Sequence, residues 1–161
     1  MRGGLWMVIA AVAWCLSVPA AAPAQKAQTP FYMSIKASKA RMRTGPGREF
    51  PAIWLYQRSG LPVRVLMVYR EWRKVEDPDG AQGWIQANLL SETRTGFVMG
   101  TVAELLESPR FGAKLLWRAA PGVVGRVSKC ARGWCWFDVM GRSGYVEVNR
   151  IWGVDRDEVI R

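Results

Sequence analysis

The chain has 161 residues, with 23 Lys+Arg against 13 Asp+Glu, a formal net charge of +10, three Cys, nine Trp and no His. Without His, the chain cannot be a Ser-His-Asp or Cys-His hydrolase, hold a His-ligated zinc ion or use a His general base. Half of the residues are hydrophobic, which indicates a folded chain with room for one ordinary domain or two small ones.

The N-terminal segment, residues 1–24, has the layout of a secretory signal peptide. Arg2 supplies the positive charge, Leu5–Val18 is an uncharged apolar run, and Ala22-Pro23-Ala24 before Gln25 offers a cleavage site between small residues. The run is shorter than the ~20 residues of a transmembrane helix, although a retained membrane anchor is the alternative. We predict cleavage between Ala24 and Gln25, a periplasmic or secreted protein, and no stable membrane insertion after cleavage.

The rest of the chain repeats itself weakly, at an offset of about 62 residues. The matching segments, in chain order, are Ile53-Trp54-Leu55 with Leu115-Leu116-Trp117, Arg64-Val65 with Arg126-Val127, Trp72 with Trp134, and Gly83-Trp84-Ile85 with Gly144-Tyr145-Val146. An ordered series of this kind predicts two homologous modules. We place them at 37–93 and 97–154, after a linker over 25–36 and before a C-terminal tail over 155–161.

Each module has the sequence pattern of β structure. Apolar and polar residues alternate around Val63 and Val65, and Trp134–Val139 is rich in aromatic and β-branched side chains. Turn signals recur, among them Asp77-Pro78-Asp79-Gly80 and Gly141-Arg142-Ser143-Gly144. No window of ten or more residues has convincing helical periodicity. Several short strands joined by tight turns predict an all-β chain with one small barrel per module.

The segment from Ala40 to Leu90 resembles the bacterial Src-homology-3-like (SH3-like) domain, in its exported proteobacterial branch. The resemblance lies in the opening Ala40–Gly47, the strand Trp72-Arg73-Lys74-Val75, the hairpin residues Gly83-Trp84-Ile85 and the closing Leu90. Residues 97–153 match the same pattern more loosely. The resemblance implies two tandem SH3-like barrels that serve as binding modules, often for cell-wall peptidoglycan.

Two cysteines, Cys130 and Cys135, lie outside the predicted signal peptide. In the repeat alignment they stand on either side of a turn between two strands, where facing residues are close enough for a disulfide. Export would place them in an oxidising compartment. We predict a structural disulfide. A redox-active pair and free thiols are the alternatives, the former disfavoured because the spacing is not C-x-x-C.

The aromatic residues of the hairpin strands suggest a ligand-binding face. Strand alternation puts Cys135 and Phe137 on the core side and turns Trp134 and Trp136 outward, with Trp72 as the counterpart of Trp134. Two interpretations follow for this pair: the rings line a ligand groove, or they pack between the modules or over a barrel end. The candidate ligand-binding residues are Arg43, Trp72, Trp134 and Trp136.

The positive charge favours an anionic partner, although a solvated basic surface is the commoner meaning of such charge. Peptidoglycan stem peptides carry carboxylates, which Arg holds bidentately. An exported chain normally meets no nucleic acid, and we expect none as partner. The sequence therefore indicates a non-enzymatic exported binding protein for cell-wall peptidoglycan, or alternatively a scaffold for another envelope protein. It contains no predicted catalytic, metal or cofactor site, and it leaves the oligomeric state open.

Overall fold

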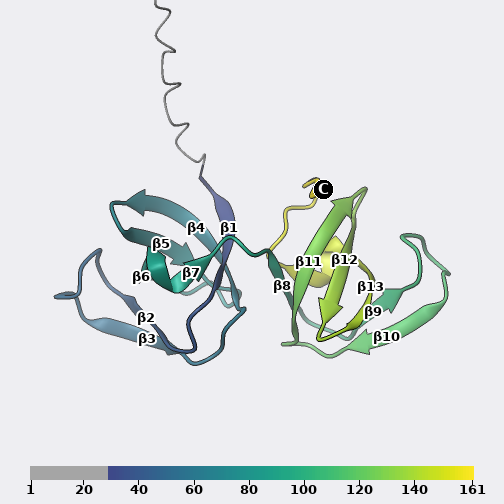
Figure 1. Ribbon diagram of the computed structural model, residues 1–161, viewed down its shortest axis with the longest axis horizontal. Coiled ribbons are helices and arrows are strands. Elements are labelled where there is room, and N and C mark those ends of the chain that lie inside the picture. The colour runs from purple at the N-terminus through teal and green to yellow at the C-terminus, as the bar shows by residue number, and fades with distance from the viewer. Residues whose placement is uncertain (1–28) are drawn as a thin grey trace, which may run out of the picture.

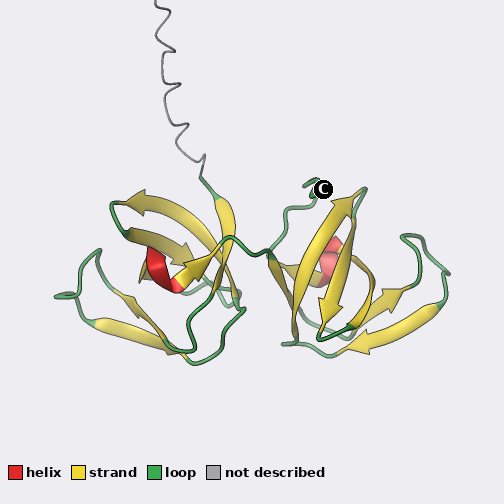
Figure 2. Ribbon diagram, in the orientation of Figure 1, coloured by secondary structure: helices red, strands yellow, loops and turns green. Residues whose placement is uncertain are grey.

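The computed structural model describes residues 29–161 (Figure 1). The predicted signal peptide over 1–24, the cleavage site at Ala24 and Gln25, and the first part of the predicted linker lie outside the described residues. The described chain forms two seven-stranded sheets that follow one another in sequence, each curled into a small module (Figure 2). The only helical elements within residues 29–161 are two short 3-10 turns. The expected all-β class with two tandem small barrels is confirmed.

The first sheet, module 1, has the strand order β3-β2-β6-β5-β4-β1-β7. Its elements are β1 (Phe31–Ile35), β2 (Ala40–Arg43), β3 (Ala52–Tyr56), β4 (Pro62–Tyr69), β5 (Trp72–Glu76), β6 (Gln82–Gln86), the 3-10 turn η1 (Ala87–Leu89) and β7 (Leu90–Ser91).

The second sheet, module 2, has the order β10-β9-β13-β12-β11-β8-β14, which is the order of module 1 with each strand number raised by seven. Its elements are β8 (Thr95–Val98), β9 (Ala103–Leu106), β10 (Leu115–Ala119), β11 (Val124–Ala131), β12 (Trp134–Val139), β13 (Arg142–Glu147), the 3-10 turn η2 (Val148–Arg150) and β14 (Ile151–Trp152). The repeat in sequence is thus a repeat in topology.

Each module has its own hydrophobic core, built from alternate residues of its strands. In module 1, Val63, Val65 and Ile85 are fully buried, and in module 2 Phe137 and Val146 are fully buried. Of these, Val63, Val65 and Phe137 are the core positions expected from strand alternation. The two cores are separate clusters, so each module buries its own apolar face.

The glycine that precedes the aromatic residue of the hairpin motif has a steric role. A Cβ on Gly83 would lie 2.8 Å from the backbone oxygen of Arg43, and a Cβ on Gly144 would lie 2.9 Å from the backbone of Leu105. These glycines allow β6 to approach β2, and β13 to approach β9, at a distance that any side chain would prevent. The barrel of each module can therefore close only if this position of the motif is glycine.

Strand β1 occupies part of the predicted linker over 25–36. It pairs antiparallel with β4, where Phe31 faces Val65 and Met33 faces Val63, and it also pairs with β7. This stretch contains only five residues, too few for its alternation to distinguish a strand from a linker. The described part of the expected linker is thus mainly a strand of the sheet.

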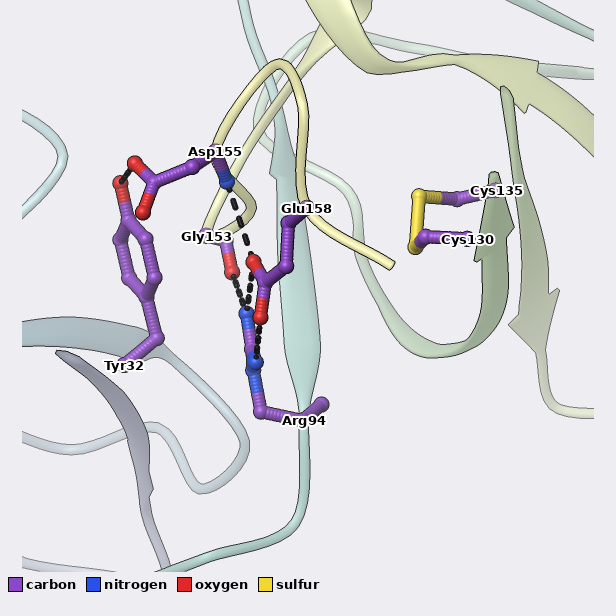
Figure 3. A network of polar contacts seen from close by, with 7 residues as sticks. All are labelled: Tyr32, Arg94, Cys130, Cys135, Gly153, Asp155 and Glu158. Atoms are coloured by element: carbon purple, nitrogen blue, oxygen red, sulfur yellow. Dashed lines mark hydrogen bonds and ion pairs between the residues drawn. A yellow bond between two sulfur atoms is a disulfide. The ribbon is translucent and has the colours of Figure 1, made fainter. Parts of the chain in front are cut away.

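The C-terminal tail over 155–161 is docked onto module 2 and does not extend freely. Glu158 forms a two-pronged ion pair with Arg94, and the backbone N–H of Ile160 donates to the carbonyl of Cys130 at 3.0 Å. The Ile160 side chain packs against the core of module 2. The tail therefore completes this module (Figure 3).

The first residue of the tail, together with β14 and the residues beside it, takes part in the contact between the two modules. Tyr32 of β1 donates from its hydroxyl to Asp155 at 3.4 Å and meets the Trp152 ring edge to face at 5.3 Å. The guanidinium of Arg94 lies over the Tyr32 ring, 5.4 Å from its centre, and also donates to the carbonyl of Gly153 at 2.8 Å. Figure 3 shows Tyr32, Arg94, Gly153, Asp155 and Glu158 gathered around the junction of the modules.

This junction is expected to weaken at both extremes of pH. The hydrogen bond from Arg94 lowers the pKa of Glu158 below its ordinary 4.5, so the stabilisation is present above that value and is lost as pH falls through the folded pKa. Burial raises the pKa of Tyr32 from 10.0 to about 12, so its contribution is complete below pH 10.0 and is lost as pH rises through about 12.

The loss at high pH is measured by phenolate absorbance of the wild type and Tyr32→Phe. The loss at low pH is measured by amide hydrogen exchange at Ile160 in the wild type and Glu158→Gln. The wild type should contain a late phenol titration that Tyr32→Phe lacks. The protection of the Ile160 amide, measured relative to the intrinsic exchange rate at each pH, should fall on acidification in wild type and should already be low at neutral pH in Glu158→Gln. A phenol titration that is missing from Tyr32→Phe but has its midpoint near pH 10.0 in wild type would contradict the assignment.

The predicted disulfide is present. Cys130 and Cys135 are fully buried, bonded through their sulfur atoms, and their Cα atoms lie 4.1 Å apart. They flank the turn between β11 and β12, as expected from the repeat. Their counterparts in module 1, Val68 and Arg73, face each other in the β4–β5 ladder. The disulfide thus replaces a cross-strand pair.

Replacing both cysteines by serine is expected to lower the free energy of unfolding by about 2 kcal/mol, because the closed loop is short and constrains the unfolded chain only modestly. Urea unfolding of the double variant, compared with reduced and oxidised wild type, measures this. The reduced wild type isolates the effect of the bond, because serine also places hydroxyl groups at two fully buried positions. A reduced protein as stable as the oxidised one would show that the bond contributes nothing to stability.

Candidate functional site

Module 1 carries a groove of about 440 Å³ beside the β2–β3 hairpin. The lining residues come from β2 and its flanks, β3, β5, β6 and η1, and are Lys39, Arg41, Arg43, Arg48, Leu55, Trp72, Gln86 and Leu89. Four of these eight side chains are cationic at neutral pH, and none is acidic. The groove is therefore an electropositive concavity with an apolar part.

Trp72 forms the inner wall of this groove. It is the first residue of β5, pairs with Gln86 of β6, and has an exposed fraction of 5%. Trp134, its counterpart in module 2, pairs with Glu147 and has an exposed fraction of 8%. The outward, exposed position that alternation predicts for both rings is wrong, because neighbouring elements of the same module cover them. Each ring lines a groove within its own module.

Arg43 and its neighbours give the groove its charge. Arg43 is half-buried, and one of its guanidinium nitrogens donates to the backbone oxygen of Phe50 at 2.7 Å, which ties β2 to the hairpin loop. Lys39, Arg41 and Arg48 are exposed. No ion pair joins any of these four side chains to a carboxylate within residues 29–161. Their charges face solvent and the groove.

Module 2 has a groove at the same place in its fold, with a volume of about 430 Å³. The strand ladders fix the correspondence: Arg41 faces Leu55 as Glu104 faces Arg118, and Arg43 faces Trp84 as Leu106 faces Tyr145. Leu55 therefore corresponds to Arg118, one position beyond the Trp117 to which the sequence repeat matched it. The lining residues are Val102, Glu104, Leu106, Phe111, Gly112, Ala113, Leu115, Arg118, Trp134, Glu147 and Arg150. The groove is thus duplicated in position and size, while its charge differs.

The fourth predicted ligand residue, Trp136, lies outside both grooves. It is half-buried on β12 and packs edge to face on Tyr145 of β13, with ring centres 5.0 Å apart. The structure therefore brings Arg43 and Trp72 together in one groove, places Trp134 in the other, and separates Trp136 from both.

Some lining residues of both grooves were not singled out by the sequence, among them the ladder partners of the two tryptophans. Leu55 and Gln86 in module 1, and Glu147 and Phe111 in module 2, carry no motif of their own. The available signal was the cluster of cations in Lys39–Arg48, directly after the first strand. No group of three or more metal-ligating side chains was found within the described residues, and no described helix is long and apolar enough to cross a membrane.

Comparison with known proteins gives a clear family. The sequence model of the bacterial SH3 domain matches twice, over residues 36–92 and 100–153. No match was found among the curated proteins.

Two solved structures are similar over much of the chain. NlpC1 from Trichomonas vaginalis has 13% identity and a TM-score of 0.36, over 80% of this chain and 47% of that one. NlpC2 from the same organism has 14% identity and a TM-score of 0.36, over 81% and 52%. The chain thus spans about half the length of either. Both the repeat and the family match show that this chain belongs to the bacterial SH3 domain family and contains two tandem copies of that domain.

Proposed function

We propose that this chain is an exported, non-enzymatic binding protein whose module 1 groove takes carboxylate groups of cell-wall peptidoglycan stem peptides. The observation that carries the proposal is the set of four cations around the buried Trp72, none of them paired with a described carboxylate. Arginine guanidinium groups bind carboxylates through two parallel hydrogen bonds. Trp72 and Leu55 offer apolar contact to the aliphatic parts of the same ligand.

The groove suits a short segment of ligand. A volume of about 440 Å³ accommodates a few residues, and the exposed position of Arg41 and Arg48 lets them reach a ligand without rearrangement of the core. Bacterial SH3 domains are generally binding modules, which supports a non-catalytic role. The strongly basic chain also favours binding to the anionic groups of the envelope.

An interaction with another envelope protein is the second candidate, and strand β3 favours it. Ile53, Trp54 and Leu55 are exposed on this strand, which lies at the edge of the sheet. An exposed apolar edge strand offers both side chains and unpaired backbone groups to an extended partner.

Sedimentation with intact sacculi tests the proposal. Purified residues 25–161 should pellet with sacculi at low salt, and a variant with Lys39, Arg41 and Arg48 replaced by Glu should bind at least about tenfold more weakly, since charge-assisted hydrogen bonds are lost. Arg43 is kept because it holds the hairpin loop. The matched control replaces three exposed cations outside the grooves, Lys36, Arg126 and Arg161, by Glu and should bind like wild type.

Three results would count against the proposal. Absence of wild-type sedimentation at low salt would reject wall binding and favour the protein partner. An equal loss in the control variant would show that overall charge, and not the groove, binds the wall. Release of soluble muropeptides would overturn the non-enzymatic role.

A further inference from the structure

The two grooves occupy the same place in their modules and have nearly the same volume, but their charged lining residues differ. The corresponding positions of modules 1 and 2 are Lys39 and Val102, Arg41 and Glu104, Arg43 and Leu106, Arg48 and Phe111, Leu55 and Arg118, Gln86 and Glu147, and Leu89 and Arg150. All four cations of module 1 have been replaced by an acidic or apolar residue. Trp72 and Trp134 are the pair that is unchanged.

We infer that the module 2 groove is a second binding site of different specificity, which takes a primary ammonium group carried on an aliphatic stem. The inference rests on the proposed function in treating this part of the fold as a binding groove, and it goes beyond it in assigning module 2 a ligand of opposite charge. Three features of the groove support it: its aromatic wall, its apolar lining and one carboxylate without a partner among the described residues.

The aromatic wall consists of Phe111 and Trp134. Phe111 has an exposed fraction of 76%, and its ring meets that of Trp134 edge to face, with centres 5.4 Å apart. Leu106 and Leu115 continue the apolar lining. An aliphatic stem gains contact area on these side chains, and an ammonium group is attracted to the face of an aromatic ring. An arginine at the Phe111 position, as in module 1, would repel the same group.

Among the charged residues of the groove, Glu147 is the carboxylate that remains available to accept hydrogen bonds from an ammonium group. Glu104 forms an ion pair with Arg118 at 3.6 Å, so these two charges offset each other. Arg150 is exposed, and its guanidinium donates to the hydroxyl of Thr101 at 3.0 Å. The Glu147 side chain makes no hydrogen bond or ion pair with any other residue in 29–161, and it stands opposite Trp134 in the β12–β13 ladder.

Two further arginines bound the site on its other side. Arg132 and Arg156 line a smaller hollow that shares Phe111, Trp134 and Glu147 with the groove. The groove side is the more favourable approach to Glu147. There Arg118 is paired with Glu104 and Arg150 donates to Thr101, whereas Arg132 and Arg156 in the adjoining hollow have no ion-pair partner among residues 29–161 and repel an ammonium group.

The test uses three small probes with the same capped backbone: N-acetyl-lysine methylamide, N-acetyl-norleucine methylamide and N-acetyl-glutamate methylamide. They are titrated into ¹⁵N-labelled residues 25–161, and the indole N–H signals of Trp72 and Trp134 are followed. The lysine probe should shift the Trp134 signal and bind there about fivefold or more tightly than norleucine, which has a similar stem without the charge. The glutamate probe should shift Trp72.

Variants then identify the acceptor. Glu147→Gln, which introduces the residue type that module 1 has at this position, should weaken lysine-probe binding about fivefold or more, whereas Glu107→Gln, at an exposed site outside the groove, should leave it unchanged. Unperturbed spectra of both variants confirm folding. The inference is overturned if the norleucine or glutamate probe binds at Trp134 as tightly as the lysine probe does. It is also overturned if Glu147→Gln binds the lysine probe as tightly as wild type. A glutamate probe without effect on Trp72 counts against the proposed function instead.

Discussion

Asp77→Ala is expected to lower the free energy of unfolding of module 1 by about 3–5 kcal/mol, because it removes the acceptor of a buried hydrogen-bond network. Asp77 has an exposed fraction of 4%. Its carboxylate accepts from the Tyr56 hydroxyl at 2.8 Å and from the backbone N–H groups of Asp79 and Ala81 at 3.1 and 2.8 Å. Without it, the backbone N–H groups of Asp79 and Ala81 in the turn between β5 and β6 lose their side-chain acceptor, and the Tyr56 hydroxyl loses its partner.

Tyr56→Phe isolates one part of this network and should cost less, about 1–2 kcal/mol. Burial, together with the bond to Asp77, raises the pKa of the Tyr56 phenol well above its ordinary 10.0. The stabilisation from the neutral phenol is therefore complete below pH 10.0 and disappears only at strongly alkaline pH.

Urea unfolding measures both variants, with amide exchange to separate the modules. The matched control is Asp79→Ala, at an exposed position of the same turn, which should change stability by less than about 0.5 kcal/mol. Module 2 has no equivalent network, since Ala119 and Val139 stand at the corresponding positions. Asp77→Ala with a stability within about 1 kcal/mol of wild type would refute a structural role for this carboxylate.

Much of the fold was predictable from sequence because the residues that close a small barrel have few substitutes. Gly83 and Gly144 recur at matching positions since a Cβ at either would collide with the strand it crosses. Buried positions such as Val65 and Phe137 followed from alternation, because each sheet has only one face toward its core. The Cys130–Cys135 bond followed from its place beside a hairpin turn.

The candidate site was harder to predict, because alternation determines the face of a strand on which a residue lies but not what covers that face. Trp72 and Trp134 do lie opposite the core residues of their strands, yet they are buried, since the non-core face of β5 and β12 forms the inner wall of a groove. Trp136, two residues further on, packs on Tyr145 instead. The docking of the tail through Glu158 also depends on a partner far away in sequence, Arg94.

Because Trp72 is buried, its substitution affects the stability of module 1 and cannot by itself measure ligand binding. Trp72→Ala is expected to lower the free energy of unfolding by about 3–5 kcal/mol, because truncation of a buried aromatic side chain leaves a cavity that the surrounding strands cannot fill. The matched control is Trp54→Ala on edge strand β3, where the exposed fraction is 56% and the expected cost is below about 1 kcal/mol.

Thermal or urea unfolding of the two variants under the same conditions checks this difference. Equal stabilities would mean that the Trp72 ring is not held in the module as described. With the expected difference, loss of wall binding in Trp72→Ala reflects partial unfolding of module 1 and does not identify a contact with ligand.

Arg41→Gln, in contrast, removes an exposed charge that pairs with no described carboxylate, so it should leave stability within about 0.5 kcal/mol of wild type. A fall in its affinity for sacculi would then measure the contribution of that guanidinium to binding.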